Sequence, residues 1–499
     1  MKPANNEIRR YDNFIAGRWV PPESGDYSEN TNPADAREVL SEHALSSPAD
    51  VDKAVEAARE AFPAWRAMPM PARARLLDRA LALAVKRQEE LATTLTLEEG
   101  KTLHESRGEI KKGLNLLEYY VGEGWRVSGE TLPSEMPRTF TYTIRQPIGV
   151  VAVITPWNFP WAIPCWKIAP ALVAGNCVVF KPASWTPLTA CKLMEIFHEA
   201  GFPPGVVNMV TGGGGVIGNH LVEHPDTRVI SFTGSTEVGR RLNQMAAAQL
   251  KKVTCEMGGK NPVIVLDDAD LDLACEGIIQ GAFGSTGQRC TATSRVVVTS
   301  GVHRDLVDRL VARMKTIKVG PGIHEESQMG PAVSPAQFRI DMAAIERGRA
   351  EGARLVYGGA ALGDGPCAHG HFVQPTLFDG VTPEMELNRE EIFGPILSVL
   401  EARDFDHAIE LANSVRYGLA SSLYARDIGS IMRYIDESEV GMVHVNSPTV
   451  GGEAQLPFGG IKETGVGDRE MGHWGIEFFT EIKTVFLDYT GKKRDTNIY

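Results

Sequence analysis

Alternating strand-like and helix-like segments in residues 148–317 restrict the possible folds more than any other feature of the sequence. Short apolar runs typical of buried strands occupy residues 148–154, 176–180, 206–210, 228–232, 263–266 and 295–299. Segments typical of helices stand between them, at 165–174, 187–200, 270–283 and 302–317. Strands that alternate with helices favour a parallel sheet covered by helices. The sequence therefore predicts an α/β fold with two parallel-sheet units, one on each side of about residue 256.

The two ends of the chain predict further elements. Residues 13–33 alternate apolar and turn-forming residues, as short strands do. Ser47 followed by Pro48 predicts the start of a helix, and a second long helix is expected over 72–99, ended by Gly100. The tail over 478–488 is strand-like, and a terminal strand of this kind often pairs with a sheet of another subunit.

Composition excludes several classes of protein. The 499 residues carry a net charge of -12 without a long run of Lys or Arg, so we expect no nucleic-acid partner. The most apolar stretches, 148–154 and 171–180, are too short to span a membrane, and no apolar run follows the first charges as in a secretory signal. Seven Cys without a C-x-x-C pair suggest neither disulfides nor a metal site, so we expect a cytoplasmic protein.

Cys290, in GSTGQRCTATSR at 284–295, is the first candidate for chemistry. A thiolate is a strong nucleophile, and a loop rich in backbone N–H groups beside Arg289 would favour the charged form. Taken alone, a single Cys is more often a small buried apolar residue.

Glu256 and Asn158 are the next two candidates. Glu256 stands beside Gly258 and Gly259 at the expected junction of the two units, where clefts usually bind ligands. Its carboxylate could activate water, or it could form a salt bridge in the junction. Asn158, in TPWNFP, could stabilise an oxyanion through its amide, or simply occupy a turn.

Three segments are candidates for nucleotide binding. Lys181 ends a predicted strand in FKPASWTP, and FTGSTEVG at 232–239 reads as a strand, a Gly turn and a helix start, which can bind phosphate. TGGGGVIG at 211–218 is a similar junction, although Gly turns between a strand and a helix often have only a structural role. Neither of the two glycine-containing segments is a G-x-G-x-x-G fingerprint. EEIFGP at 390–395 offers Glu391 and Phe393, or an ordinary acidic turn.

These motifs together resemble one family in identity and order. TPWNFP, KPAS, FTGSTEVG, EMGGK, GQRCTATSR, EEIFGP and LPFGGIKETG are similar to the motifs of the aldehyde dehydrogenase superfamily, and the likeness runs from residue 13 to 484. The resemblance implies that Cys290 is the nucleophile and Glu256 the general base. It implies that Asn158 and the backbone N–H of Cys290 form the oxyanion hole.

The resemblance also implies a nucleotide site for NAD or NADP. Lys181 would bond the adenosine ribose, and Ser235 with Gly234 would lie at the pyrophosphate. Glu391 would hold the nicotinamide ribose beside Phe393 and Trp157, and Gln337 would add a ribose contact. Ser184, third after Lys181, is small and neutral. A Glu there would repel a 2′-phosphate, so Ser184 predicts that NADP is tolerated.

The resemblance implies three structural parts. Residues 1–124 and 146–255 would form the cofactor-binding domain and 256–473 the catalytic domain. Residues 125–145 and 474–499 would form a small β segment for oligomerisation. We therefore expect a homodimer or homotetramer with a small-molecule aldehyde as substrate.

The aldehyde is predicted less directly. GQRCTATSR and the LPFGG region are similar to semialdehyde dehydrogenases, including those for 2-oxoglutarate semialdehyde and succinate semialdehyde. Arg289 could bind the carboxylate of such an aldehyde, or could bond its own loop. Phe159 and Trp161 would equally suit an apolar or aromatic aldehyde, and Glu453 would disfavour anions if it faced inward.

Two other functions stay open at this point. A CoA-acylating relative would usually lack the base at the Glu256 position. A non-catalytic binding protein that kept the scaffold would not need Cys290, Glu256 and Asn158 together.

Overall fold

The computed structural model describes residues 8–493, and its first α/β unit is built on an eight-stranded sheet of order β24-β12-β11-β8-β9-β10-β2-β3. Five strands are parallel, as the sequence predicts: β8 (Val150–Ile154), β9 (Cys177–Lys181), β10 (Val207–Met209), β11 (Thr227–Thr233) and β12 (Lys252–Glu256). Antiparallel strands form the two edges: β2 (Asn13–Ile15), β3 (Arg18–Val20) and β24 (Gly465–Val466). The predicted division at residue 256 is therefore not complete. After building the second unit, the chain returns to the first sheet as β24.

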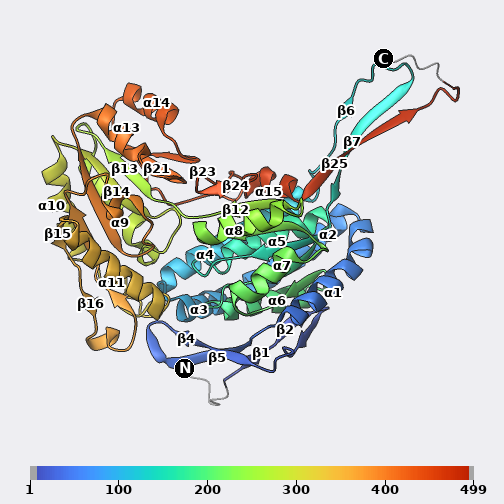
Figure 1. The fold of residues 1–499 in the computed structure, drawn as a ribbon, viewed down its shortest axis with the longest axis horizontal. Helices are drawn as coiled ribbons and strands as arrows, with labels where there is room; N and C mark the ends of the chain where they lie inside the picture. Colours follow the sequence, from blue (N-terminus) through green and yellow to red (C-terminus); the bar gives the residue numbers. More distant parts are fainter. Residues whose placement is uncertain (1–7, 494–499) are drawn as a thin grey trace.

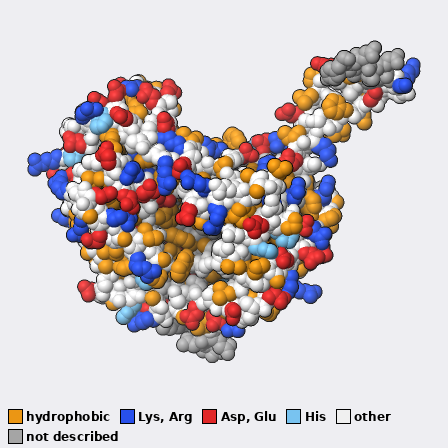
Figure 2. All heavy atoms as spheres, viewed as in Figure 1, with side chains coloured by type: hydrophobic (Ala, Val, Ile, Leu, Met, Phe, Trp, Pro, Cys, Tyr) orange, Lys and Arg blue, Asp and Glu red, His pale blue; other side chains and the backbone are white. Residues whose placement is uncertain are grey.

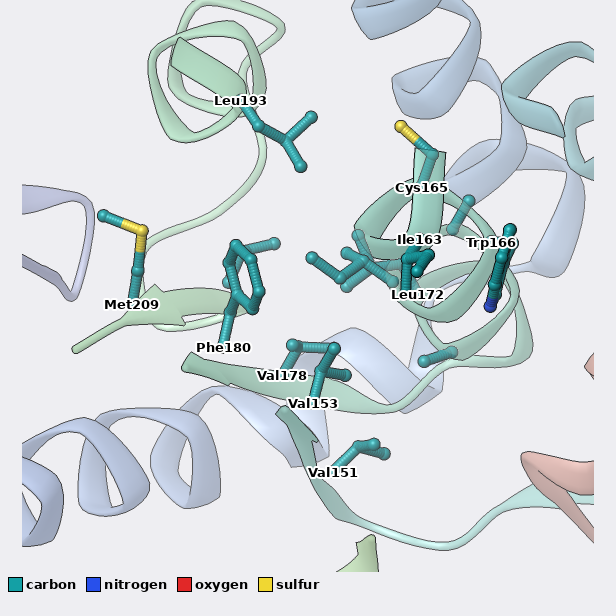
Figure 3. Packing of buried hydrophobic residues seen from close by; sticks show 14 of the residues in the cluster. Val151, Val153, Ile163, Cys165, Trp166, Leu172, Val178, Phe180, Leu193 and Met209 are labelled. Carbon is teal, nitrogen blue, oxygen red and sulfur yellow. The ribbon is translucent and has the colours of Figure 1, made fainter. Parts of the chain in front are cut away.

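Helices cover both faces of this sheet (Figure 1). One face carries α1 (Pro48–Ala67), α7 (Asn219–Glu223) and α8 (Thr236–Ala247). The other carries α5 (Ala162–Ala174) and α6 (Pro187–Glu199), with α2 (Met70–Lys86), α3 (Gln88–Glu99) and α4 (Leu103–Glu123) packed against them. Every residue of β8, β9 and α5 is buried. Figure 3 shows Val151, Val153, Val178 and Phe180 of the strands in the cluster of buried apolar residues that also contains Leu172 of α5.

The N-terminal helices follow the sequence signals with one exception. α1 begins after Ser47, whose side chain and that of Asp50 form a capping box. The predicted helix over 72–99 is two helices, α2 (Met70–Lys86) and α3 (Gln88–Glu99). Arg87 between them has φ -104° and ψ 10°, which departs from helical geometry. Continuous helix-forming residues give no local sign of this break, whereas Gly100 ends α3 at φ 100° as predicted.

The second unit is a seven-stranded sheet of order β15-β18-β19-β14-β13-β21-β22. Its strands are β13 (Asn261–Val265), β14 (Thr293–Thr299), β15 (Arg354–Tyr357), β18 (Thr376–Asp379), β19 (Ile396–Ala402), β21 (Ala420–Tyr424) and β22 (Met442–Val445). Only β15 runs antiparallel to its neighbour among these described strands. One face packs against α9 (Leu271–Phe283) and α10 (His303–Met314), and the other against α11 (Pro335–Ala350), α13 (Phe405–Asn413) and α14 (Ile428–Glu437). The prediction of two α/β units is confirmed.

A three-stranded arm projects from the first unit and holds the C-terminal end of the described chain (Figure 1). It consists of β6 (Thr131–Leu132), β7 (Thr139–Pro147) and β25 (Thr480–Asp488), and β25 pairs with β7 along its whole length. The strand-like tail therefore finds its sheet within the same chain. The last residues of the predicted β segment, 494–499, lie outside the described range.

The remaining elements are small. They are β1 (Arg10–Tyr11), β4 (Tyr27–Asn32) and β5 (Asp35–Ala44) in one sheet, the pairs β16 (Ala361–Leu362) with β17 (Phe372–Val373) and β20 (Tyr417–Gly418) with β23 (Ile461–Lys462), and the helices α12 (Glu386–Arg389) and α15 (Gly472–Phe478). Within residues 8–493, no helix combines the length and apolar character that crossing a membrane requires.

Candidate active site

A cavity of about 470 Å³ reaches the side chain of Cys290. Helices α4 and α5, the loop after α9 and the segment 450–458 form its walls. The lining residues are His104, Glu105, Gly108, Glu109, Lys112, Phe159, Ile163, Trp166, Gln280, Gly284, Ser285, Arg289, Cys290, Thr291, Val450, Gly451, Gly452 and Phe458. In Figure 2 the surface is hollowed between the two α/β units, and hydrophobic side chains gather there.

The loop that carries Cys290 is held from several sides. Asn261, the first residue of β13, donates its side-chain amide to the backbone oxygens of Cys290 (2.8 Å) and Ala292 (2.9 Å). Gln288 accepts from the Val333 backbone N–H at 2.9 Å. Because the sulfur sits on a loop fixed by these bonds, its position is set by segments remote in sequence.

The glycines of the EMGGK motif allow three segments to approach one another. A Cβ on Gly259 would lie 2.7 Å from the backbone oxygen of Cys290, and one on Gly258 would lie 2.2 Å from a carboxylate oxygen of Glu391. Both distances are too short for a real carbon atom. The chain between β12 and β13 therefore needs residues without side chains where Cys290 and Glu391 meet.

The Cys290 thiol is protonated in this environment. Burial raises its pKa to about 12; the carboxylates of Glu391 and Glu256 raise it, and the Lys112 ammonium lowers it. The backbone N–H of Thr291 in the same loop also lowers the pKa of the thiol, as expected of this loop, whereas Arg289 is not among the main causes of the shift. The Arg289 guanidinium donates instead to Ser285 Oγ at 3.0 and 3.1 Å and lies 3.7 Å from Glu105.

Asn158 is buried between the first unit and the Cys290 loop. Its amide nitrogen donates to the Gln288 carbonyl at 3.0 Å, and its own backbone carbonyl accepts from Lys101 Nζ at 2.6 Å. Lys101 in turn pairs with Glu109 at 2.7 Å. The buried ion pair therefore fixes the backbone of Asn158 next to the loop that carries the sulfur.

Glu256 ends β12 with its side chain buried. Its Oε2 has no hydrogen-bond partner in the described chain. Burial raises its pKa well above the ordinary value, and the nearby Glu470 carboxylate adds to this, while Lys167 and Arg469 oppose it. A carboxylate whose pKa is raised is a stronger base than an ordinary one, which suits a general base.

The predicted nucleotide residues lie at strand ends and at a helix start. Lys181 ends β9 and donates Nζ to the Pro182 carbonyl at 2.8 Å, and burial lowers its pKa to about 8. Ser235 is the N-cap of α8, with Gly234 before it, and its side chain makes no capping hydrogen bond. Ser184 donates to the Gly212 carbonyl at 3.0 Å. A phosphate could therefore accept from the Ser235 hydroxyl and the start of α8.

Glu391 and Phe393 face the Cys290 loop from the second unit. Glu391 Oε1 accepts from the Gly259 backbone N–H at 2.9 Å, and burial raises the pKa of Glu391 to about 7. Phe393 adopts the left-handed φ of 65°, and its ring lies edge-on to that of Trp157, 5.3 Å between centroids.

Gln337 lies beside the segment that carries Glu391 and Phe393. Its amide nitrogen donates to Asp341 Oδ1 at 2.8 Å and to the Ile392 carbonyl at 3.0 Å. Both N–H groups are therefore used within the protein, so the ribose contact, which stays a prediction, would use the amide oxygen as an acceptor.

Two predicted substrate residues lie away from the cavity. Trp161 is fully buried and is not among the residues that line the cavity. It precedes α5 inside the helical layer, where a Cβ on Gly113 of α4 would lie 2.1 Å from its indole nitrogen. Glu453 is exposed, lines an outer groove and accepts from Gln455 Nε2 at 2.6 Å. Phe159, by contrast, lines the cavity, with Lys101 Nζ 4.2 Å from its ring centroid.

The sequence reasoning missed three contributors: Asn261, Lys101 and Lys112. Asn261 follows the EMGGK motif directly, so its position was the one available signal. Lys101 and Lys112 stand among charged residues typical of exposed helices, and nothing local distinguishes them. Over residues 8–493, no three His, Cys, Asp or Glu side chains are grouped so that they could hold a metal ion.

Comparisons with known proteins agree with this geometry. The model of the aldehyde dehydrogenase family matches residues 19–485. Alpha-ketoglutaric semialdehyde dehydrogenase of Bacillus subtilis is 46% identical over 481 residues, 96% of this chain and 99% of that protein. The crystal structure of an NAD-dependent aldehyde dehydrogenase from Sinorhizobium meliloti superposes with a TM-score of 0.95 at 36% identity, over 99% of this chain and 97% of that one. A crystal structure of an E. coli NADP dependent enzyme gives 0.93 at 38% identity, over 97% and 99%.

Proposed function

The chain belongs to the aldehyde dehydrogenase family and is an NAD(P)-dependent enzyme, and we propose that its substrate is a semialdehyde that carries a carboxylate, such as 2-oxoglutarate semialdehyde. The product is the corresponding dicarboxylic acid, formed through a thioester on Cys290. The observation that supports this most is the single cavity that joins Cys290 to a wall bearing Lys112 and Arg289. The identity to a semialdehyde dehydrogenase over nearly the whole chain agrees with it.

The first step uses the Cys290 sulfur as nucleophile. Because the pKa of the thiol is raised, its proton must pass to a base as the sulfur attacks the aldehyde carbon. Glu256 fits this role, since one of its buried oxygens has no other partner in the described chain. The proton then leaves to solvent before the second step.

The charge that develops on the aldehyde oxygen needs donors. An amide nitrogen has two N–H groups, and in the described chain Asn158 gives one of them to Gln288. The backbone N–H of Cys290 has no acceptor there. These two donors can stabilise the oxyanion, each by about 3 kcal/mol in the transition state.

The nucleotide site fits a dinucleotide. The start of α8, where the Ser235 side chain makes no capping hydrogen bond, suits a pyrophosphate, and Lys181 and Glu391 suit the hydroxyls of the two riboses. When bound, the oxidised nicotinamide supplies the acceptor for the hydrogen and electron pair that leave the substrate carbon. Glu256 then takes a proton from water, which attacks the thioester and releases the acid and the Cys290 thiol.

The test is the ratio of kcat/KM values over a panel of aldehydes. Succinate semialdehyde, 2-oxoglutarate semialdehyde, benzaldehyde and betaine aldehyde are compared under the same conditions. We expect the highest value for an aldehyde with a carboxylate, and free acid as the product in the presence of CoA. A best substrate without a carboxylate contradicts the proposal, and acyl-CoA without free acid contradicts the hydrolytic step.

NADP is proposed as a working cofactor alongside NAD. Ser184 presents a small neutral side chain three residues after Lys181, and its hydroxyl is held by the Gly212 carbonyl. No carboxylate at this position repels a 2′-phosphate. The expectation fails if NADP at saturation supports less than about a hundredth of the NAD rate, a ratio that corresponds to about 2.7 kcal/mol.

The arm is proposed to join subunits into a homodimer or homotetramer. Exposed apolar side chains gather on it: Leu132, Phe140, Ile144, Ile482, Phe486 and Leu487. Its strands have open edges that could pair with another copy. The molar mass of the purified protein in solution, measured by light scattering, should be two or four times the 54.4 kDa of one chain, whereas a stable monomer contradicts this assignment.

A further inference from the structure

The charged groups around the aldehyde cavity are paired with one exception. Glu109 binds Lys101 at 2.7 Å and accepts from the backbone N–H of Trp161 at 2.9 Å. Glu105 accepts from the Ser285 backbone N–H at 2.5 Å and lies 3.7 Å from Arg289. Each carboxylate on the wall is therefore balanced by a cation of its own.

Lys112 is the exception. Within residues 8–493 its ammonium has neither a hydrogen bond nor an ion pair, although the side chain lines the cavity that holds Cys290. Nζ lies 5.2 Å from the ring centroid of Trp166 and 5.9 Å from that of Phe458. Burial lowers the pKa of Lys112, while the nearby charges of Cys290 and Glu109 raise it.

Space is left around this ammonium by two glycines. Gly108 lies one helical turn before Lys112 on α4, and a Cβ there would meet no atom within 4 Å. A Cβ on Gly452 would lie 3.5 Å from Lys112 Nζ. Both glycines line the cavity, so a small anion can reach the ammonium without displacing a side chain.

Arg289 is less available than Lys112. Its guanidinium already donates twice to Ser285 Oγ and faces Glu105, so its charge is partly neutralised. Glu453 does not compensate Lys112, because the two side chains form no ion pair in the described chain. The net charge offered to a ligand in the cavity is thus a single positive one.

We propose that the Lys112 ammonium binds the carboxylate of the semialdehyde and so selects acidic aldehydes over neutral ones. The inference rests on the proposed function and names the residue responsible for its specificity. One ammonium matches one negative charge, and the rings of Trp166 and Phe458 lie beside this ammonium. The aldehyde end of the same molecule is then directed towards Cys290 in the same cavity.

The experiment compares Lys112→Met with Lys111→Met, each assayed with succinate semialdehyde and with butanal. Lys111 is the exposed neighbour on the same helix, so its variant controls for the loss of one positive charge. Loss of a charge-assisted hydrogen bond should lower kcat/KM of Lys112→Met for the semialdehyde about 10- to 100-fold, mainly through KM. Butanal should change less than about 3-fold, and Lys112→Arg should recover most of the loss.

The ratio of the two kcat/KM values isolates the carboxylate contact. Any effect of the lost charge on the Cys290 thiol is common to both aldehydes and cancels in the ratio. An unchanged ratio in Lys112→Met, or an equal change in Lys111→Met, overturns the inference. If the unaltered enzyme does not prefer the semialdehyde, the proposed function has failed instead, so the two failures are distinguishable.

Discussion

The two sides of the Cys290 sulfur differ in charge. On the side where the nucleotide is proposed to bind, Glu391 is a buried carboxyl group whose pKa is raised to about 7, and it raises the pKa of the thiol. On the side where the aldehyde is proposed to bind, Lys112 is a cation without a partner in the described chain, and it lowers the pKa of the thiol. Each side is complementary to a different ligand.

This difference explains how one sulfur can serve two ligands of opposite charge. The oxidised nicotinamide ring is positive and suits the side with Glu391, whereas a carboxylate suits the side with Lys112. Burial outweighs both effects and keeps the thiol protonated, with a pKa of about 12, while neither ligand is bound. The nucleophile is therefore expected to depend on its ligands and on Glu256 for activation.

Replacing the Cys290 sulfur should abolish the reaction, because both the nucleotide side and the aldehyde side depend on this one nucleophile. Cys290→Ser is expected to lower kcat by at least about 10⁴-fold, because an alcohol is a much poorer nucleophile and leaving group than a thiol. NADPH binding, followed by its fluorescence, should be unchanged because the nucleotide side stays intact. Cys367→Ser, in a small cluster with Phe372, is the matched control and should keep full turnover. Full turnover by Cys290→Ser would contradict the mechanism.

Removing the base should slow both chemical steps, because Glu256 is proposed to take a proton first from Cys290 and then from water. In Glu256→Gln, steady-state turnover should fall about 10²- to 10⁴-fold, as is typical for loss of general base catalysis. A burst of NADH or NADPH before the slow phase, and a protein mass increased by the acyl group, would show that water attack is the slower step. Loss of the burst as well would mean that Glu256 is needed mainly to deprotonate Cys290.

The pH dependence of thiol reactivity measures the balance between the two sides. Because the pKa of Cys290 is raised far above neutrality, its thiolate fraction in the nucleotide-free enzyme grows about tenfold per pH unit. Alkylation by iodoacetamide, located by peptide mass spectrometry, should accelerate about 100-fold between pH 7 and 9. An alkylation rate that reaches a plateau below pH 8 would contradict a raised pKa for this thiol. It would show that the effect of Lys112 on the pKa outweighs burial and the effect of Glu391.

The smallest expected effect is confined to the nucleotide side. Glu391→Gln keeps the shape but removes the charge, so the KM of the nucleotide should rise about 10-fold, while the KM of the aldehyde changes less than about 2-fold. Glu390→Gln is the control, because Glu390 is tied to Arg416 at 2.6 Å outside the site. Equal changes in both KM values would mean that the two sides are not separate.

Much of the fold could be predicted because its signals are local. Strand and helix segments of both units follow from patterns within about ten residues, and Ser47 and Gly100 mark helix ends through their own side chains or backbone. The break at Arg87 could not be predicted, because tertiary packing rather than local propensity decides it. The pairing of β25 with β7 joins segments over 330 residues apart, as the Thr480–Pro147 register shows.

The sequence by itself determined the family and the order of the strands and helices, and it predicted which residues carry the chemistry, because these depend on residue identity and short spacing. Only the tertiary structure decided how each group is charged and what it faces. It buried Trp161, paired Arg289 with Glu105, and left Lys112 without a partner in the described chain. Charge and pKa depend on neighbours a few ångströms away that lie far apart along the chain, so no local pattern contains them.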